Sequence, residues 1–323
     1  MKEEMLREQL PFTLRGTDFP IKDAQFYGGK VRDNYTIGDR RVIVVTDKVS
    51  AFDVVIGTIP FKGQVLNQMA EFWFKQTRDI VKNHMIKTID PNVMLVRQAD
   101  TLPVEMVVRA YITGVTKTSA WYNYEQGVRD FCGNQLPEGL RKDHKLEKVI
   151  LTPSTKAEKG DHDESVSAEE VVRRGLVSKE LMDQLSEISF KLFEVGSQLV
   201  AKQGIILVDT KYEFGLDKEG NIMLIDEIHT PDSSRFWFAD TYQQLFDAGQ
   251  EQRKIDKEYI RKWLADQGYR GDGMPPILPP AVKIEAALRY IQAYEKITGQ
   301  KFVPAVGNVS NRIETSLKES GFL

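Results

Sequence analysis

Two apolar segments near the middle of the chain carry acidic and basic residues where a buried strand is expected. Residues 207–214 read LVDTKYEF, and LIDEIHTPDSSRFW begins a few residues later. Side chains alternate between the two faces of a β-strand, so Asp209, Lys211 and Glu213 are predicted to share one face. Asp226 follows directly on the apolar run IMLI of the predicted partner strand. The sequence therefore predicts a pair of strands with charged groups on one side.

This charged face has two interpretations. A solvent-exposed sheet face would spread its charges along both strands, and each ion pair there contributes at most about 1 kcal/mol. Here the acids and the lysine lie at the ends of runs that look buried, where a bare charge is costly. Carboxylates beside a lysine suit Mg²⁺ and phosphate oxygens, so the functional interpretation is favoured.

A glycine-rich stretch, YGGKVRDNY, precedes another predicted strand. Its glycines allow backbone amides to approach an anion closely, and Lys30 and Arg32 add positive charge on one face of the strand. The same residues also fit a glycine turn that leads into a solvated edge strand. The stretch alone leaves both interpretations open.

Three further groups are weaker candidates. Arg109 and Arg235 lie beside predicted strand ends and could each clamp a phosphate or a carboxylate. The polar loop TPSTKAEKGDHDESVS offers Lys156 and Asp163, although without other information it is interpreted as a flexible surface loop. The four histidines are scattered, which is more typical of structural than of catalytic histidines.

Composition excludes several classes of protein. A formal net charge of −3 predicts neither nucleic-acid nor membrane binding. The single cysteine, Cys132, excludes an intramolecular disulfide framework and a cysteine-rich zinc site. The N-terminus does not resemble a signal peptide and no apolar run is long enough to span a membrane, so we expect a cytoplasmic protein. P-loop, dinucleotide-binding and HExxH motifs are missing from the sequence.

The pattern of elements predicts a mixed fold. Strand-like runs around Gly38 and Asp39 predict a tight hairpin, and a helix is predicted over 64–81. Ser167 and Glu170 form a capping-box pattern before a short helix. A long amphipathic helix is predicted over 178–202, and the last eighty or so residues read as helical. We expect three segments: a β-rich lobe over 1–110, a central α+β lobe over 111–240, and a helical segment over 241–323 that packs on the central lobe.

Five stretches, in the same order, resemble the SAICAR synthetase (phosphoribosylaminoimidazole-succinocarboxamide synthase) family. They are YGGKVRDNY, KVSAFD with IPFKGQVLN, VEMVVRAYITG with TSAW, TPSTKAEKGDHDESVS, and LVDTKYEFG with LIDEIHTPDSSRFW. They extend from about residue 27 to residue 237. Between YITG and SAW this chain has VTKT, where shorter members run the glycine straight into the serine, and those members also lack much of the helical tail.

The resemblance implies an α+β fold in which ATP binds between an antiparallel β-rich N-terminal lobe and a larger α+β lobe, as in ATP-grasp enzymes and kinases. It implies an ATP-dependent ligase that joins L-aspartate to the carboxylate of the imidazole ribonucleotide CAIR, forming SAICAR, ADP and phosphate in de novo purine biosynthesis. The alternatives are a kinase-like phosphotransferase, whose HRD and DFG motifs are missing, and a nucleotide-binding module without catalysis. Partners are then small molecules, with Mg²⁺ as cofactor, no nucleic acid and no membrane, in a monomer or small homo-oligomer.

The family also implies site residues, each at the position matching a family motif. Those for ATP are Gly29, Lys30, Arg32, Arg97, Ala99, Thr101, Glu213 and Asp226, and the last two also hold Mg²⁺. Those implied to be catalytic are Lys156, Asp163, Asp209 and Lys211. Those implied to bind the substrates are Ser50, Asp53, Arg109, Ser119, Asp232 and Arg235.

Overall fold

The chain forms two compact units, which are described separately. The computed structural model describes residues 2–52, 54–156, 164–255, 258–271 and 273–323. Unit 1 comprises Met1–Lys75, His84–Gln98 and Ile255–Leu323, and unit 2 comprises Gln76–Asn83 and Ala99–Lys254. Two residues implied by the family resemblance, Asp53 and Asp163, lie outside the described residues.

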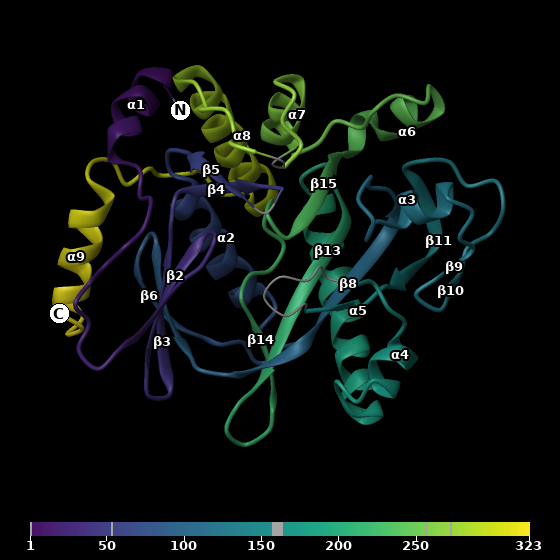
Figure 1. The fold of residues 1–323 in the computed structure, drawn as a ribbon, viewed down its shortest axis with the longest axis horizontal. Helices are drawn as coiled ribbons and strands as arrows, with labels where there is room; N and C mark the ends of the chain where they lie inside the picture. The colour runs from purple at the N-terminus through teal and green to yellow at the C-terminus, as the bar shows by residue number, and fades with distance from the viewer. Residues whose placement is uncertain (1, 53, 157–163, 256–257, 272) are drawn as a thin grey trace. The chain divides into compact units, whose positions relative to one another are not determined.

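Unit 1 is built on a five-stranded antiparallel sheet with the strand order β1-β2-β3-β7-β6. Figure 1 labels three of these strands, β2, β3 and β6. Its strands are β1 (Gln25–Gly28), β2 (Arg32–Ile37), β3 (Arg40–Val45), β6 (Met85–Asp90) and β7 (Val93–Arg97). The predicted hairpin is confirmed, because β2 and β3 pair on either side of Gly38, whose φ is 57°. The edge strand β1 leads into the glycine-rich turn.

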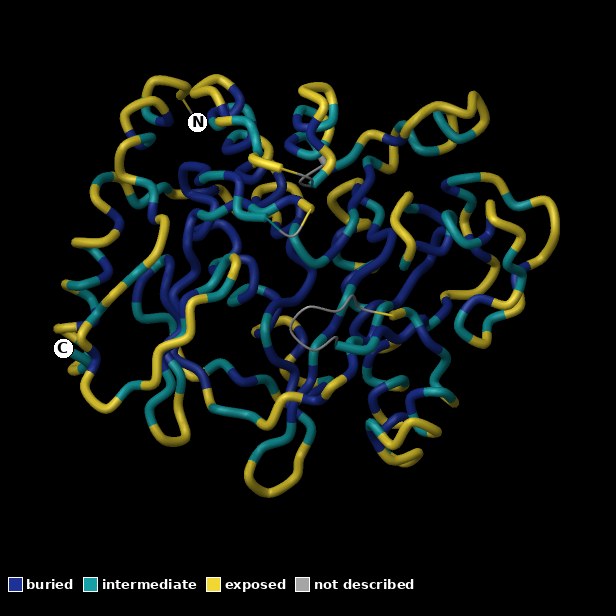
Figure 2. The backbone as a smooth tube through the Cα atoms, viewed as in Figure 1, coloured by how far each residue is buried: buried dark blue, intermediate teal, exposed yellow. Residues whose placement is uncertain are grey.

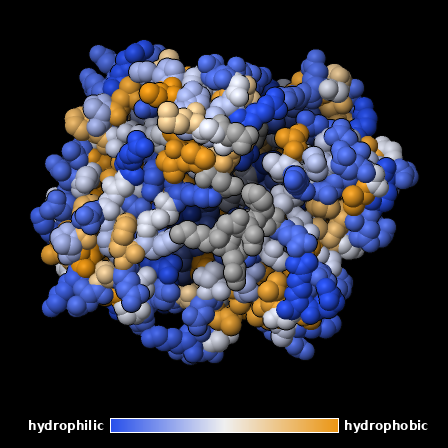
Figure 3. Space-filling view, viewed as in Figure 1, coloured by the Kyte–Doolittle hydropathy of each residue, from blue (hydrophilic) through white to orange (hydrophobic). Residues whose placement is uncertain are grey.

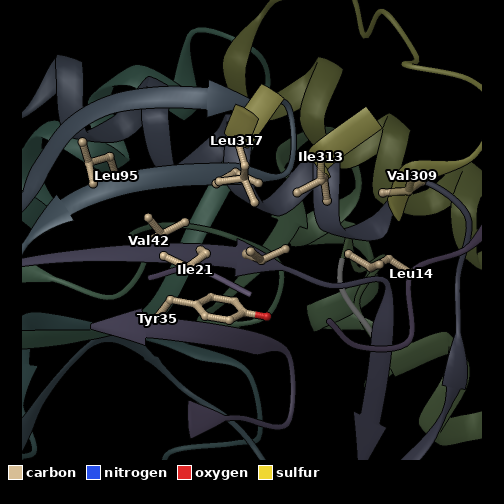
Figure 4. Packing of buried hydrophobic residues seen from close by; sticks show 10 residues of the cluster. Leu14, Ile21, Tyr35, Val42, Leu95, Val309, Ile313 and Leu317 are labelled. Atoms are coloured by element: carbon tan, nitrogen blue, oxygen red, sulfur yellow. The ribbon is translucent and has the colours of Figure 1, made fainter. Parts of the chain in front are cut away.

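The C-terminal helix α9 (Val309–Glu319) packs on this sheet. Val309, Ile313 and Leu317 recur every four residues and so line one face of the helix. The buried cluster that they join also contains Leu14, Ile21, Tyr35, Val42, Val44, Val93 and Leu95 (Figure 4). Helix α9 of the helical tail therefore buries its apolar face against the N-terminal sheet, and the expected packing of the tail on the central lobe stays a prediction.

The other elements of unit 1 are α1 (Glu3–Gln9), the 3₁₀ helix η1 (Leu10–Phe12), the hairpin β4 (Lys48–Ala51) and β5 (Val54–Thr58), α2 (Lys62–Gln76), α7 (Glu258–Asp266) and α8 (Pro280–Thr298). Helix α2 was predicted over 64–81 but ends at Gln76, because Thr77 begins a turn in which its carbonyl accepts from the amide of Ile80. Helix α8 ends at Thr298 and is capped by Gly299, whose left-handed φ of 69° suits glycine.

Unit 2 is built on a long antiparallel sheet with the order β11-β8-β13-β14, in which β12 also pairs with β8 and β15 also pairs with β13. Its strands are β8 (Asp100–Ile112), β11 (His144–Leu151), β12 (Ser154–Thr155), β13 (Ile205–Leu216), β14 (Ile222–Ile225) and β15 (Ser234–Phe238). Much of β8 and β13 is buried (Figure 2). A smaller buried cluster joins α3 (Ala120–Glu125) and β9 (Asp130–Phe131) to β8 and β11, and β9 pairs with β10 (Asn134–Gln135).

Helix α5 (Lys179–Ala201) packs on β13 and β8 (Figure 1). It was predicted over 178–202, and Ser178 caps it by accepting from the amide of Leu181. The shorter helix α4 (Ala168–Arg173) begins as predicted, with the Ser167 hydroxyl accepting from the amide of Glu170 at 3.1 Å. Helix α6 (Ala239–Asp247) follows β15. The sheet therefore has one face covered by α5.

No helix within the described residues is long and apolar enough to cross a membrane. On the face shown in Figure 3, hydrophilic residues predominate. The antiparallel sheets and the helical C-terminal segment agree with the α+β class predicted from the sequence. The boundaries of the two units are not those of the three consecutive segments expected, and the functional division of the chain into those segments stays a prediction.

Candidate active site

One row of charged residues crosses three strands of the unit 2 sheet. In the register, Asp209 of β13 lies opposite Arg109 of β8 on one side and Arg235 of β15 on the other. Directly opposed residues of antiparallel strands point to the same face. One oxygen of Asp209, Oδ2, accepts from Nη1 of Arg109 at 3.2 Å and from Nη1 of Arg235 at 2.9 Å. The row carries two positive charges and one negative charge.

The two arginines differ in exposure. The Arg109 side chain is only 6% exposed, and its remaining donors bond to the Thr152 hydroxyl at 2.8 Å and the Thr118 carbonyl at 3.0 Å. Burial lowers the pKa of the Arg109 guanidinium, which Asp209 partly offsets. Arg235 is 30% exposed. Arg109 is therefore held rigidly, while Arg235 is the accessible member of the row.

Ser119 lies next to this row, despite the VTKT segment. A Cβ atom on Gly114 would lie 2.4 Å from Oγ of Ser119 and 2.9 Å from Nη1 of Arg235. The hydroxyls of Ser119 and Thr116 are 2.8 Å apart. Gly114 also has a φ of 93°, which a residue with a Cβ rarely adopts. Glycine is needed here for close packing as well as for its backbone conformation.

A second charged row lies farther along the same face of β13. Glu213 of β13 is directly opposite Glu105 of β8, and Nζ of Lys211 donates to both, at 2.5 Å and 2.6 Å. Nζ of Lys156 donates to the other oxygen of Glu213. Two glutamates facing each other would repel, so the lysines hold this row together.

The lysines and carboxylates of this row shift one another's pKa values. Burial alone lowers the pKa of Lys211, but Glu213, Glu105 and Asp226 raise it above its usual value. Burial alone raises the pKa of Glu213, but Lys211 and Lys156 lower it below its usual value. Both groups are therefore charged at neutral pH. With Asp226 included, the second row carries three negative and two positive charges.

Asp226 enters this row from an interruption in the sheet. β14 and β15 pair with the same edge of β13, and residues 226–233 connect them beside Lys211 and Tyr212, which lie between the two paired stretches of β13. We call this segment the 226–233 bulge. Its first residue, Asp226, has a left-handed φ of 65°. Such interruptions are common beside active sites, where they redirect side chains.

The glycine-rich stretch forms the turn between β1 and β2 in unit 1. The amide of Gly29 donates to the carbonyl of Arg32 at 2.7 Å, and a Cβ atom on Gly29 would meet that carbonyl oxygen at 2.7 Å. Nζ of Lys48 donates to the carbonyl of Gly29 at 2.7 Å and to Asp33 at 3.2 Å. Lys30 is exposed at the turn. The turn is therefore a tight, anchored structure with a lysine at its tip.

The other residues implied by the family lie in several elements. Ser50 is on β4, and Arg97 ends β7 with an exposed side chain. Thr101 of β8 lies opposite Gly215 of β13. Ala99 also lies near Gly215, since a Cβ atom there would be 2.9 Å from Cβ of Ala99. Asp232 lies in the 226–233 bulge, where its amide donates to the Thr230 hydroxyl at 3.2 Å.

Three contacts in unit 2 were missed from the sequence: Glu105, Thr152 and the carbonyl of Thr118. Glu105 had a signal, because it interrupts an apolar run and shares a strand face with Arg109. Thr152 and Thr118 had none, since a threonine in a strand or loop is ordinary. The structure places Arg109, Ser119, Lys156, Asp209, Lys211, Glu213, Asp226 and Arg235 in these two rows or beside them.

The SAICAR synthetase family model matches residues 25–276. The phosphoribosylaminoimidazole-succinocarboxamide synthase of Legionella pneumophila (strain Paris) is 47% identical over 308 residues, covering 94% of this chain and 97% of that protein. That of Bacteroides thetaiotaomicron is 45% identical over 310 residues, covering 94% and 97%.

A solved structure is similar to this chain over most of its length. The SAICAR synthase of Saccharomyces cerevisiae, complexed with SAICAR, superposes with a TM-score of 0.78 at 31% identity and covers 90% of this chain and 99% of its own. The match spans both structural units, and both strands of the predicted charged face lie within the region of the family model. The chain therefore belongs to the SAICAR synthetase family.

Proposed function

We propose that the two charged rows on β13 form the CAIR-binding and phosphoryl-transfer parts of the active site. The protein is an ATP-dependent ligase of purine biosynthesis, as its family membership shows. It joins L-aspartate to the carboxylate of CAIR and releases ADP and phosphate. A phosphotransferase that uses another acceptor is not favoured.

The observation that carries this assignment is the opposite charge of the two rows on one strand face. The row of Arg109, Asp209 and Arg235 has a net positive charge and suits the phosphate of CAIR. The row around Lys211 and Glu213 has a net negative charge and suits a cation-bound polyphosphate.

The spacing of the rows fits one substrate. Asp209 and Glu213 are four residues apart on β13, which is about 13 Å along an extended strand. A ribonucleotide whose phosphate lies at Arg235 can then place its ring carboxylate near Lys211. This supports binding of CAIR along the strand, with its reacting end at the second row.

The reaction needs the carboxylate of CAIR to become a better electrophile, because oxide is a poor leaving group. Transfer of the γ-phosphoryl group to a carboxylate oxygen releases ADP and gives an acyl phosphate. The amine of aspartate then attacks the carbonyl carbon, loses a proton and expels phosphate. Lys211, held protonated by its carboxylate neighbours, is placed to balance negative charge on the phosphoryl group, and Asp209 orients both arginines.

We assign Mg²⁺ to Glu213 and Asp226. Within the described residues, no three His, Cys, Asp or Glu side chains could enclose a metal alone, but Mg²⁺ typically takes one or two carboxylates together with phosphate oxygens and water. Hard carboxylate oxygens fit this ion, and the net negative charge of the row favours a cation. When bound, the ion would neutralise charge on the phosphates.

The remaining roles follow from the family motifs. Lys30 and Arg32, with the amides around Gly29, would contact the ATP phosphates, and backbone groups of residues 97–101 would hold adenine. Ser50, Lys156 and Asp232 would orient CAIR or aspartate. We also propose a cytoplasmic location, which agrees with the free thiol of Cys132, and a monomer or small homo-oligomer.

The test measures ADP release with Mg²⁺ and ATP while CAIR and L-aspartate are added singly and together. We expect SAICAR to form only when both are present. Glu213→Gln and Asp226→Asn should lower turnover by about 10²-fold or more, as expected when charge stabilisation of a transition state is lost. Glu147→Gln, an exposed glutamate on β11, is the matched control. Near-normal turnover in both site variants would refute the metal assignment, and ADP release independent of aspartate would refute the ligase chemistry.

A further inference from the structure

His229 lies in the middle of the 226–233 bulge and is completely buried. Its ring nitrogen Nε2 is 2.6 Å from the hydroxyl of Tyr212, which is also completely buried. Tyr212 lies between Lys211 and Glu213 on β13, so its side chain points to the opposite face from theirs. The contact between His229 and Tyr212 therefore ties the bulge to the back of the charged strand.

The imidazole occupies a space that exists only because residue 196 is glycine. A Cβ atom on Gly196 of α5 would lie 2.1 Å from Cε1 of His229 and 2.6 Å from its Nδ1. The backbone of Gly196 is in an ordinary helical conformation, so no positive φ calls for glycine here. Glycine inside a helix is unfavourable relative to alanine. The observed packing explains it, because it makes room for His229.

The bulge also holds two residues in a disfavoured backbone conformation. Asp226 has a φ of 65° and His229 a φ of 50°, both in the left-handed region. Such conformations persist only where the surroundings hold them in place. Two contacts hold the bulge to β13: that of His229 with Tyr212 near its middle, and the bond from the Lys211 amide to the Ser233 carbonyl, at 3.1 Å, at its end.

We propose that His229, seated between Tyr212 and Gly196, is a positioning residue that fixes the 226–233 bulge so that Asp226 faces Lys211 and Glu213. The proposal rests on the function assigned above to Asp226. If His229 has this role, the affinity for the Mg²⁺ complex of a nucleotide depends on the buried contact between His229 and Tyr212 on the opposite face of the sheet. Affinity for the nucleotide without metal depends on it much less.

The direct test is Gly196→Ala, which displaces the imidazole without changing any charged group. We expect the dissociation constant for ADP with Mg²⁺, measured by calorimetry on the full chain, to rise at least about tenfold, since small misplacements of a site group have large effects. The constant for ADP in EDTA should change less than about twofold. In kinetics, KM for ATP should rise more than KM for CAIR, because the bulge contributes only Asp232 to the proposed substrate contacts.

A double-mutant cycle tests whether Gly196 acts through His229. His229→Ala should reproduce the weaker binding of Mg²⁺ and ADP, and adding Gly196→Ala to it should cause no further loss, because the imidazole is already gone. Leu185→Ala, which removes buried volume three turns away on the same helix, is the matched control. It should lower thermal stability without changing the affinity for Mg²⁺ and ADP.

If Gly196→Ala does not fold, Tyr212→Phe replaces it in the test, because it keeps the ring and removes only the hydroxyl. We expect it to raise the dissociation constant for ADP with Mg²⁺ by about threefold or more. Folded variants that bind Mg²⁺ and ADP as tightly as the unmodified chain would overturn the proposal, as would full additivity in the cycle. Asp226→Asn distinguishes a failure of the proposed role of His229 from a failure of the metal assignment to Asp226. If it leaves the affinity for Mg²⁺ and ADP unchanged, the metal assignment itself is wrong, whatever the Gly196 variant does.

Discussion

Replacing Lys211 with methionine should separate its role in holding the sheet together from its role in chemistry. Nζ of Lys211 bonds to Glu105 at 2.6 Å and to Glu213 at 2.5 Å, and these glutamates are directly opposed in the β8–β13 register. Methionine keeps most of the length and the apolar stem. It removes the positive charge between the two carboxylates.

The expected loss of stability follows from charge and burial. Removing one partner of a fully buried ion pair costs about 3–5 kcal/mol. Lys211 is 31% exposed and Lys156 still reaches Glu213, so we expect a smaller loss, about 2 kcal/mol at pH 7. The net charge of the second row changes from −1 to −2 when Lys211 is removed.

The loss should depend on pH in a defined direction. The folded state lowers the pKa of Glu213, so its ion pairs add stability above the unfolded pKa, about 4.3, and lose it as the pH falls further. The difference between the variant and the unmodified chain should therefore be full at pH 7 and shrink below about pH 4.3. Urea unfolding at several pH values between 3.5 and 8 measures the difference in unfolding free energy between the two proteins. Each unit of pKa shift contributes about 1.4 kcal/mol to that free energy.

A second substitution distinguishes the two roles of Lys211. In Lys211→Met/Glu105→Gln, the row regains its net charge of −1, so stability should recover by about 1 kcal/mol. Turnover should stay about 10²-fold to 10³-fold below normal in both variants, because the cation facing the phosphoryl group is still missing. The reasoning is refuted if Lys211→Met unfolds at the same urea concentration as the unmodified chain, and the chemical role is refuted if the double variant regains turnover.

Three further predictions concern other parts of the molecule. Arg235→Ala should raise KM for CAIR by about 10-fold to 100-fold with a smaller change in kcat, since a charged hydrogen bond contributes about 1.5–3 kcal/mol. The control Arg253→Ala, at an exposed arginine, should change neither KM nor kcat. An unchanged KM for CAIR in Arg235→Ala would remove Arg235 from the phosphate site. Gly114→Ala should raise KM for CAIR and lower the melting temperature more than Gly139→Ala does. Both glycines have a positive φ, but only a Cβ on Gly114 would meet Ser119 and Arg235. Equal effects of the two substitutions would mean that backbone strain alone matters. Burial, with Arg32 and Arg41 nearby, lowers the pKa of His84 to about 3. Between about pH 3 and 6.5 the unfolded state therefore binds one proton more than the folded state, and stability falls with falling pH. His84→Phe should make this pH dependence of stability shallower by up to about 1.4 kcal/mol per pH unit, and an unchanged slope in acid unfolding would contradict the prediction.

The charged face of β13 could be predicted from the sequence because strand alternation is a local property. Asp209, Lys211 and Glu213 lie on one face, and the predicted hairpin partner β14 is confirmed. The partners across the sheet could not be predicted in the same way. Arg109 and Glu105 bond to residues 100 and 106 positions away in the chain, and no local pattern specifies which strand becomes the neighbour.

The position of the C-terminal helices was not predictable for a related reason. An apolar stripe on a helix shows that one face is buried but does not identify the surface that covers it. The contact between α9 and the N-terminal sheet joins the two ends of the chain. His229 illustrates the same limit, since a lone histidine carries no sign that a glycine thirty-three positions earlier leaves room for its ring.

The VTKT segment shows that added residues can act on a site through a backbone carbonyl and a hydroxyl group. Its last residue, Thr118, gives its carbonyl to Nη2 of Arg109 at 3.0 Å and to the Ser165 hydroxyl at 3.3 Å, while Thr116 contacts Ser119. A buried guanidinium that loses an acceptor becomes costly, because its donors can no longer reach water. A family member without these residues must satisfy that donor in another way, so the segment between Gly114 and Ser119 and the surroundings of Arg109 have to change together. In this chain the folding of the added residues thus keeps Ser119 in contact with Thr116 and beside the row of Arg109, Asp209 and Arg235.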